Sequence, residues 1–138
     1  MRTMADTDKT LTNTILTAGK VTASGSIYPK EVLEKAVREY AERPGDSYGG
    51  VEDGLPLSLG KVTHRITDVR MDGDDVIASA VIMDTPEGMK IKAMLENGGD
   101  DRISLSSKGY GRTDENGTID RFSLDSINIS LDPGKASQ

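Results

Sequence analysis

The sequence contains no cysteine, no tryptophan and a single histidine, His64, among its 138 residues. The absence of cysteine excludes disulfide bonds, thiolate-ligated zinc and a cysteine nucleophile. One imidazole is too few for a metal site built from several histidines. We therefore predict that the protein uses neither a metal ion nor another cofactor.

Positive charge is also in short supply, because 17 lysine and arginine residues stand against 23 aspartate and glutamate residues, for a formal net charge of -6. This balance disfavours sequence-independent binding to nucleic acid and to anionic membranes. No stretch approaches the roughly 18 apolar residues of a membrane span, and the polar start does not resemble a signal peptide. We expect an intracellular protein that binds neither nucleic acid nor membrane.

Large apolar side chains are sparse, since Leu, Ile, Val and Phe together make up about a fifth of the chain. That fraction lies near the roughly 20% below which highly charged chains remain disordered. The modest net charge and the length instead favour one folded domain with a thin core. Residues 1–12 are rich in Thr and Asp and are predicted to form a mobile arm, followed by a single domain over residues 13–138.

Two helices are predicted from apolar spacing and capping residues. Apolar side chains recur at helical intervals between Pro29 and about Glu42. Thr85 is a good N-cap for a second helix, which Asn97 and Gly98 would end through a left-handed residue. The apolar face of this second helix is predicted to consist of Met89, Ala93 and Met94.

Strand-like patterns account for most of the remaining chain. Strands are predicted over Ile15–Ser24, over Leu59–Val69 and over Val76–Met83, and the last two should form a hairpin. The nearly continuous apolar run of Val76–Met83 predicts a central strand. A final hairpin is predicted over Arg102–Leu131, with its turn at Asp114–Gly117. The fold class is therefore α+β: an antiparallel sheet or small β-barrel with two packed helices.

The segment SSKGYG, Ser106–Gly111, places two hydroxyls ahead of two glycines. Such a backbone can approach a ligand closely and offer N–H groups to an oxyanion. The same residues are more typical of a polar strand end that leads into a turn. The segment alone therefore favours the structural interpretation over the functional one.

His64 is the one side chain whose unperturbed pKa, about 6.5, suits a general base at neutral pH. It also shares the phase of Val62 and Ile66 in a predicted half-buried strand. That position favours a hydrogen-bonded core histidine over a catalytic one.

Two acidic clusters could offer carboxylate oxygens to a cation. Glu52 and Asp53 lie in a glycine-rich loop, Arg43–Ser58, that is too long for a simple connection. The Asp72–Asp75 turn lacks the spacing and terminal glutamate of an EF-hand loop. A solvated loop and an ordinary hairpin turn explain both clusters, so a cation-dependent structural module is the weakest hypothesis.

Taken in order, six segments resemble the prohead core proteases of tailed phages, including the T-even type, which share the fold of the herpesvirus assembly protease. The resemblance spans roughly Thr17 to Ala136. It implies a serine protease that clears scaffold from the phage head, with a serine nucleophile, a histidine base and an orienting acid. The segments are IYPKEVLEKAVREY (Ile27–Tyr40), GGVED (Gly49–Asp53), VTHRITDVRMDGDDV (Val62–Val76), IMDTPEGMKIKAMLENG (Ile82–Gly98), SLSSKGYG (Ser104–Gly111) and LDPGKA (Leu131–Ala136).

The resemblance places the nucleophile on Ser106, the first serine of an S-S-R-G type motif, with Lys108 in place of the usual arginine. The family's base is a histidine, usually followed by proline, shortly after the glycine that opens the loop beyond the long helix. That position reads Asp53 followed by Gly54 in this sequence. The histidine expected of the family is therefore missing at its own position.

The family's acidic residue aligns with Asn128, and its D-P-S stretch reads Asp132–Gly134. His64 corresponds to a second, non-catalytic histidine in the family's S-H-x-I stretch. The resemblance thus implies a catalytic site in which only the serine is intact.

An aspartate with a reference pKa near 3.9 accepts a serine proton far less readily than imidazole. Loss of the base in a serine protease costs on the order of 10⁶ in turnover. We therefore expect an inactive head morphogenesis protein that serves as scaffold, core or capsid-decorating component. The alternative is an active maturation protease that cleaves scaffold and capsid proteins with Ser106 as nucleophile and His64 as base. Either function implies a phage capsid or scaffold protein as partner, in a homo- or hetero-oligomer, and a location in the prohead or virion assembled in the host cytoplasm.

Overall fold

The computed structural model describes residues 9–22, 25–52, 57–98 and 102–131. No helix within these ranges is long and apolar enough to cross a membrane. The elements in chain order are β1 (Lys9–Thr17), α2 (Lys30–Ala41), β2 (Ser47–Gly49), the 3₁₀ turn η1 (Leu59–Lys61), β3 (His64–Asp72), β4 (Asp75–Ile82), α3 (Pro86–Glu96), β5 (Ser104–Thr113) and β6 (Ile119–Ser130).

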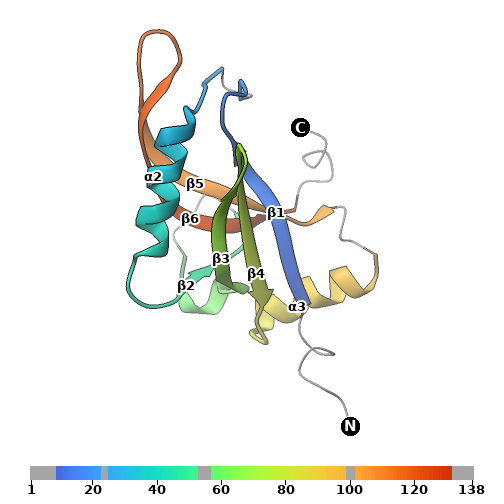
Figure 1. Ribbon diagram of the computed structural model, residues 1–138. Coiled ribbons are helices and arrows are strands. Elements are labelled where there is room, and N and C mark those ends of the chain that lie inside the picture. The colour runs from blue at the N-terminus through green and yellow to red at the C-terminus, as the bar shows by residue number, and fades with distance from the viewer. Residues whose placement is uncertain (1–8, 23–24, 53–56, 99–101, 132–138) are drawn as a thin grey trace.

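The strands form two antiparallel sheets, one in the order β1-β4-β3-β2 and the other the β5–β6 hairpin. The hairpin crosses behind the four-stranded sheet, α2 stands along one side and α3 lies beneath the end of β4 (Figure 1). This arrangement confirms the predicted α+β class with two helices. One core cluster draws on both sheets and on α2, and its fully or almost fully buried members include Leu33, Val76, Ala78, Ala80, Leu105, Leu124, Ile127 and Ile129.

The β3–β4 hairpin forms as predicted, and β4 lies between β1 and β3. Val76, Ala78, Ala80 and Ile82 are buried, whereas the residues between them are half-buried. The apolar run therefore marks a central strand with one face in the core. The β5–β6 hairpin also forms as predicted, with Gly117 in a left-handed conformation at its turn.

The first strand begins earlier than the sequence predicted. We expected a strand over Ile15–Ser24 and order only from about Asn13, but β1 spans Lys9–Thr17 and Lys9 pairs with Ile82. A Thr-rich segment can form a strand when a neighbouring strand pairs with it. Amino-acid composition indicates only how much apolar surface a segment can bury, so it does not reveal such pairing. The last residues of the predicted arm, 9–12, therefore belong to β1, and residues 1–8 lie outside the described residues.

A short strand was also missed inside the predicted loop Arg43–Ser58. β2 (Ser47–Gly49) pairs with the first residues of β3 at the edge of the sheet. Three residues flanked by Gly45 and Gly50 are too few to produce a visible period-two pattern. The predicted strand over Leu59–Val69 likewise splits, because the chain turns through η1 before β3 starts at His64.

Both helices occur close to the predicted positions. Thr85 accepts a hydrogen bond from the Gly88 amide (2.9 Å), and Gly98 follows the helix with φ of +83°. The apolar face predicted for α3 is only partly correct: Met94 packs against the core, but Met89 is 52% exposed and the buried positions include Ile91 and Lys92. The Lys92 stem can be buried because its ammonium group pairs with Asp84 at the surface.

His64 is completely buried where β3 begins, and it connects β3 to β6. Its Nε2 lies 2.8 Å from the Ile127 carbonyl oxygen and its Nδ1 lies 2.7 Å from the Thr63 hydroxyl. A carbonyl only accepts, so Nε2 carries the proton. Burial lowers the pKa of His64, although the hydrogen bond to Ile127 opposes that effect. The ring is therefore neutral at physiological pH, with Nδ1 accepting from Thr63.

Gly49 covers this imidazole so closely that we expect Gly49→Ala to destabilise the fold. A Cβ at this position would lie 2.4 Å from the Ile127 carbonyl oxygen and 2.5 Å from His64 Nε2. Overpacking of this kind costs about 1–3 kcal/mol. Gly60→Ala is the matched control, because no atom lies within 4 Å of its Cβ. Urea denaturation should show a large loss only for Gly49→Ala, and equal stability of the two variants would contradict the contact.

The lowered pKa of His64 also predicts that the fold loses stability as the pH falls from about 7.5 to 5.5. Below the unfolded-state pKa of about 6.5, the unfolded chain takes up a proton that the native ring resists. Since His64 is the only histidine, His64→Gln removes the only side chain with an unperturbed pKa in this range. The free energy of unfolding of this variant should change less with pH between 7.5 and 5.5 than that of the wild type. Parallel pH profiles would rule out the neutral buried imidazole.

Candidate functional site

Ser106 lies directly opposite Asn128 across the β5–β6 ladder. Their neighbours Leu105 and Ile129 also pair and are buried, so Ser106 and Asn128 share the opposite, outward face of the hairpin. Both are half-buried. The register therefore brings together the nucleophile and acid positions that the sequence resemblance assigned separately.

Glu52 joins this pair from a third segment of chain. The Asn128 side-chain amide donates to Glu52 Oε2 (3.2 Å) and to Ser126 Oγ (3.3 Å). A carboxylate only accepts, so the contact with Glu52 fixes the amide nitrogen toward it and leaves Asn128 Oδ1 as an acceptor elsewhere.

Backbone hydrogen bonds hold the Glu52 segment against β6. The Ile129 amide donates to the Gly50 carbonyl (2.9 Å), and the Glu52 amide donates to the Ile129 carbonyl (2.8 Å). Val51 thereby forms a parallel bridge with Ile129. The glycine-rich loop is thus brought to the edge of β6 at the level of Asn128.

Asp53, which the sequence resemblance places at the family's base position, lies outside the described residues, as do Asp132–Gly134. The structure does place its neighbour, Glu52, in contact with Asn128. From the sequence, Glu52 was expected only as a possible cation ligand. Its position directly before Asp53, the residue that the resemblance assigns to the base position, was the signal that could have linked it to this site.

His64 lies at the other edge of β6 from β5. The backbone groups of Ile129 point toward residues 50–52. The carbonyl of Ile127, two residues earlier, points toward the same edge and accepts a hydrogen bond from His64. β5, which carries Ser106, pairs along the opposite edge. The backbone of β6 therefore separates the imidazole from the serine hydroxyl, and both ring nitrogens already have partners.

The described part of the site is a row of polar groups: a hydroxyl, an amide and a carboxylate on three adjacent segments. Within the described residues, no hydrogen bond engages the Ser106 hydroxyl. An amide cannot take up a proton at neutral pH, so Asn128 can orient a hydrogen-bonding group but cannot serve as a base. This arrangement is suited to binding polar groups such as a peptide backbone.

The acidic clusters do not converge on a common point in the described parts of the chain. No group of three or more His, Cys, Asp or Glu side chains there is arranged to hold a metal ion. In the β3–β4 turn, Asp75 accepts from the Thr17 hydroxyl (2.9 Å) and Asp74 pairs with Lys30 (3.7 Å). These carboxylates therefore have protein partners.

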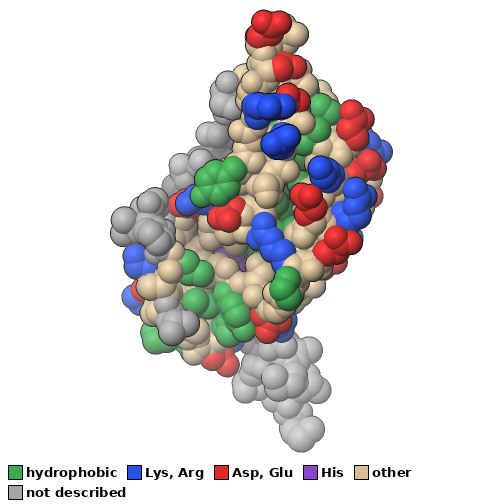
Figure 2. Space-filling view, turned by 90° about the vertical axis from the view of Figure 1, so that its left-hand side faces the viewer, with side chains coloured by type: hydrophobic (Ala, Val, Ile, Leu, Met, Phe, Trp, Pro, Cys, Tyr) green, Lys and Arg blue, Asp and Glu red, His purple; other side chains and the backbone are tan. Residues whose placement is uncertain are grey.

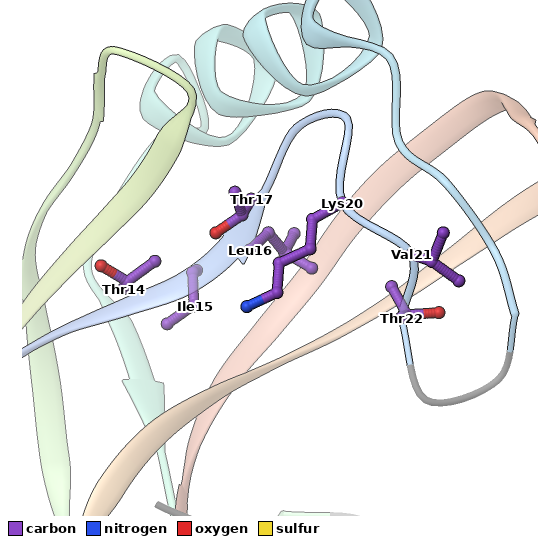
Figure 3. A pocket seen from close by; sticks show the side chains of 7 residues that line it. All are labelled: Thr14, Ile15, Leu16, Thr17, Lys20, Val21 and Thr22. Carbon is purple, nitrogen blue, oxygen red and sulfur yellow. The ribbon is translucent and has the colours of Figure 1, made fainter. Parts of the chain in front are cut away.

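A hollow of about 660 Å³ lies away from this polar row, at the C-terminal end of β1 (Figure 3). Neither Ser106 nor Asn128 lines it. Among the described residues that line it, Lys20 is the one with a charged side chain, and the close-up shows that side chain extending along β1. The described lining residues are Thr14, Ile15, Leu16, Thr17, Lys20, Val21 and Thr22.

Comparison with known proteins identifies the family. Residues 9–127 match the family model described as prohead core protein serine protease. Among solved structures, the capsid assembly protease gp21 of bacteriophage T4 is similar, with 25% sequence identity and a TM-score of 0.75 over 87% of this chain and 79% of that one. No curated protein matches the chain significantly. Because the family model covers most of the sequence, the chain belongs to the prohead core protein serine protease family.

Proposed function

We propose that this protein acts in phage head assembly by binding capsid or scaffold proteins, without cleaving them. Membership of the family supports a role in head morphogenesis, association with capsid or scaffold proteins and a location in the prohead. The observation that carries the proposal is the enclosure of the chain's one imidazole between β3 and β6, with both nitrogens hydrogen-bonded. A scaffold, core or capsid-decorating component would need the fold and its surfaces but no general base.

The chemistry of serine proteolysis explains why this enclosure matters. The serine hydroxyl must transfer its proton to a base during attack, and the base must return that proton to the leaving amine. Removal of the base costs on the order of 10⁶ in turnover, or roughly 8 kcal/mol of transition-state stabilisation. An amide in place of the orienting acid costs about 10⁴ in a related triad. In this sequence Asp53 stands where the resemblance expects the base, and Asn128 stands where it expects the orienting acid.

His64 is poorly suited to replace the missing base. It would have to leave the Ile127 carbonyl and the Thr63 hydroxyl and pass the backbone of β6 to reach Ser106. An Ile127 carbonyl left buried without a donor would cost about 1–3 kcal/mol. The lowered pKa of His64 further weakens it as an acceptor, because the neutral buried ring resists taking up a proton.

Fluorophosphonate labelling tests the loss of catalysis. At pH 7.5 we expect no labelling of the wild type, because no base activates the Ser106 hydroxyl. Asp53→His combined with Asn128→Asp should increase labelling at least 100-fold, because the double variant restores an imidazole base and an orienting carboxylate. An increase of this size is on the order of the rate gain that one general base provides. Ser106→Ala added to this double variant is the control and should abolish the signal.

Labelling of the wild type that disappears in Ser106→Ala would overturn the proposed loss of catalysis. If His64→Gln, confirmed as folded by circular dichroism, also abolished that labelling, the alternative enzyme with His64 as base would be correct. Labelling retained in His64→Gln would instead point to a different base. Each outcome therefore assigns the serine a defined role.

Head assembly in the presence of this protein tests the binding role. When the phage's own scaffold and capsid proteins are assembled with the wild type or with Ser106→Ala, both forms should enter the particles equally. The scaffold and capsid proteins should keep their full mass by mass spectrometry. Failure of both forms to enter the particles, or Ser106-dependent cleavage of either partner, would contradict the proposal.

A further inference from the structure

The core-facing side chains of β6 change phase along the strand. Leu124, Ile127 and Ile129 are all buried. Successive side chains of a strand point to opposite faces, so Leu124 and Ile127 can share the core face only if one extra residue lies between them. The apolar pattern does not specify which residue this is, because Asp125 and Ser126 both lie between the two buried positions.

The structure gives this position to Asp125. Lys108 of β5 pairs with Ser126, and the next residue of β5 pairs with Leu124, so Asp125 is the bulged residue of β6. Ser126 therefore lies on the outward face of the hairpin, where its hydroxyl accepts a hydrogen bond from the Asn128 amide (3.3 Å). The choice of bulged residue thus determines which side chain stands beside Asn128.

Arg43 binds the backbone at this bulge. Its guanidinium group donates to the Leu124 carbonyl and to the Asp125 carbonyl (2.8 Å), and it lies over the ring of the buried Tyr40, 4.8 Å from the centroid. Successive carbonyls of a regular strand point to opposite edges, so one side chain could not reach both. The planar fork of Arg43 therefore fits a bulge at Asp125 and not a regular strand there.

Charge across the hairpin favours the other choice. If Ser126 were the bulged residue, Asp125 would lie directly opposite Lys108, and such opposite-charge pairs are stabilising. Both side chains are exposed. Figure 2 looks onto the side of the molecule where α2 stands, and there Lys and Arg side chains lie among Asp and Glu side chains. A surface carboxylate can therefore exchange one basic neighbour for another, and the observed bulge needs a contact that outweighs the pair with Lys108.

We propose that Arg43 is a positioning residue that selects Asp125 as the bulged residue of β6 and so keeps its carboxylate out of the polar row. With the bulge at Ser126, Asp125 would join the outward face as a diagonal neighbour of Ser106. The row would then lose the Ser126 hydroxyl beside Asn128 and gain a negative charge. This inference concerns how the row is built, and it holds whether or not the site is catalytic.

A simpler role for Arg43 is to fasten α2 to β6. Loss of a fastening contact would lower stability but would not change which residues face each other across the hairpin. Stability measurements alone therefore cannot separate the two roles. The test must follow the pairing of β5 with β6.

Nuclear Overhauser contacts in the isotopically labelled full chain report this pairing. In the wild type we expect contacts between the backbone protons of Lys108 and Ser126. In Arg43→Ala these contacts should be replaced, in the major species, by contacts between Lys108 and Asp125. Arg43→Lys should show both sets, because an ammonium group lacks the planar fork that reaches two carbonyls. Arg38→Ala, a change at an exposed arginine in the last turn of α2, is the control and should keep the wild-type contacts.

The side-chain amide of Asn128 gives a second, independent readout. Its proton shifts are measured against pH in the wild type and in the variants. In Arg43→Ala the titration curve should gain a step that the wild type lacks, because the Asp125 carboxylate would now lie on the same face. Addition of Asp125→Asn should remove this step. Loss of a fastening contact would not add a titrating group beside Asn128.

Unchanged contacts between Lys108 and Ser126 in both Arg43 variants would overturn the proposal, as would an equal change in Arg38→Ala. Loss of these contacts without new contacts to Asp125 would show that Arg43 only fastens α2 to β6. If Arg43→Ala does not fold, Arg43→Lys alone carries the comparison. None of these results depends on fluorophosphonate labelling.

Discussion

The rest of the structure depends on the burial of one imidazole between two sheets. His64 joins β3 to β6 through the Ile127 carbonyl and is oriented by Thr63, and Gly49 leaves the space that the ring occupies. The chain then continues from Gly49 along β6, where Ile129 holds Gly50 and Glu52 by backbone hydrogen bonds. The packing of Gly49 and His64 against β6 thus also positions residues 50–52 beside Asn128. In this arrangement both nitrogens of the imidazole are already hydrogen-bonded within the core.

Much of the fold could be predicted from short sequence patterns, because helix caps, turns and hairpins are determined mainly by residues that are adjacent in the sequence. The cap at Thr85, the left-handed Gly98 and the β3–β4 turn each depend on a few adjacent residues. β1 and β2 were misjudged because pairing partners order them: Lys9 meets Ile82, and Gly49 meets His64. Burial of Lys92 in α3 was missed for a similar reason, since Asp84 neutralises an ammonium group that the sequence pattern assigns to solvent.

The candidate site was predictable only in part. The period-two pattern around Val62 correctly favoured a core position for His64, because phase within a strand determines which face meets the core. The sequence resemblance assigned Ser106 to the nucleophile position and Asn128 to the acid position. The β5–β6 register places these two residues opposite each other. The adjacency of Glu52 to Asp53 hinted at its place near the site, but its hydrogen bond to Asn128 was not predicted, because a parallel bridge between segments distant in the sequence brings the two together. The role of Asp53 stays a prediction, since it lies outside the described residues.

The two ends of β5 depend on different physical constraints. Catalysis requires a proton acceptor within hydrogen-bond distance of Ser106, so a change at one position removes it. The backbone beyond Ser106 is held instead by pairing with β6, which continues from Ser104 to Thr113. Gly109 and Gly111 are retained by the fold itself, because Phe122 packs where their side chains would lie. The backbone of β5 is therefore maintained by core packing, whether or not a base activates Ser106.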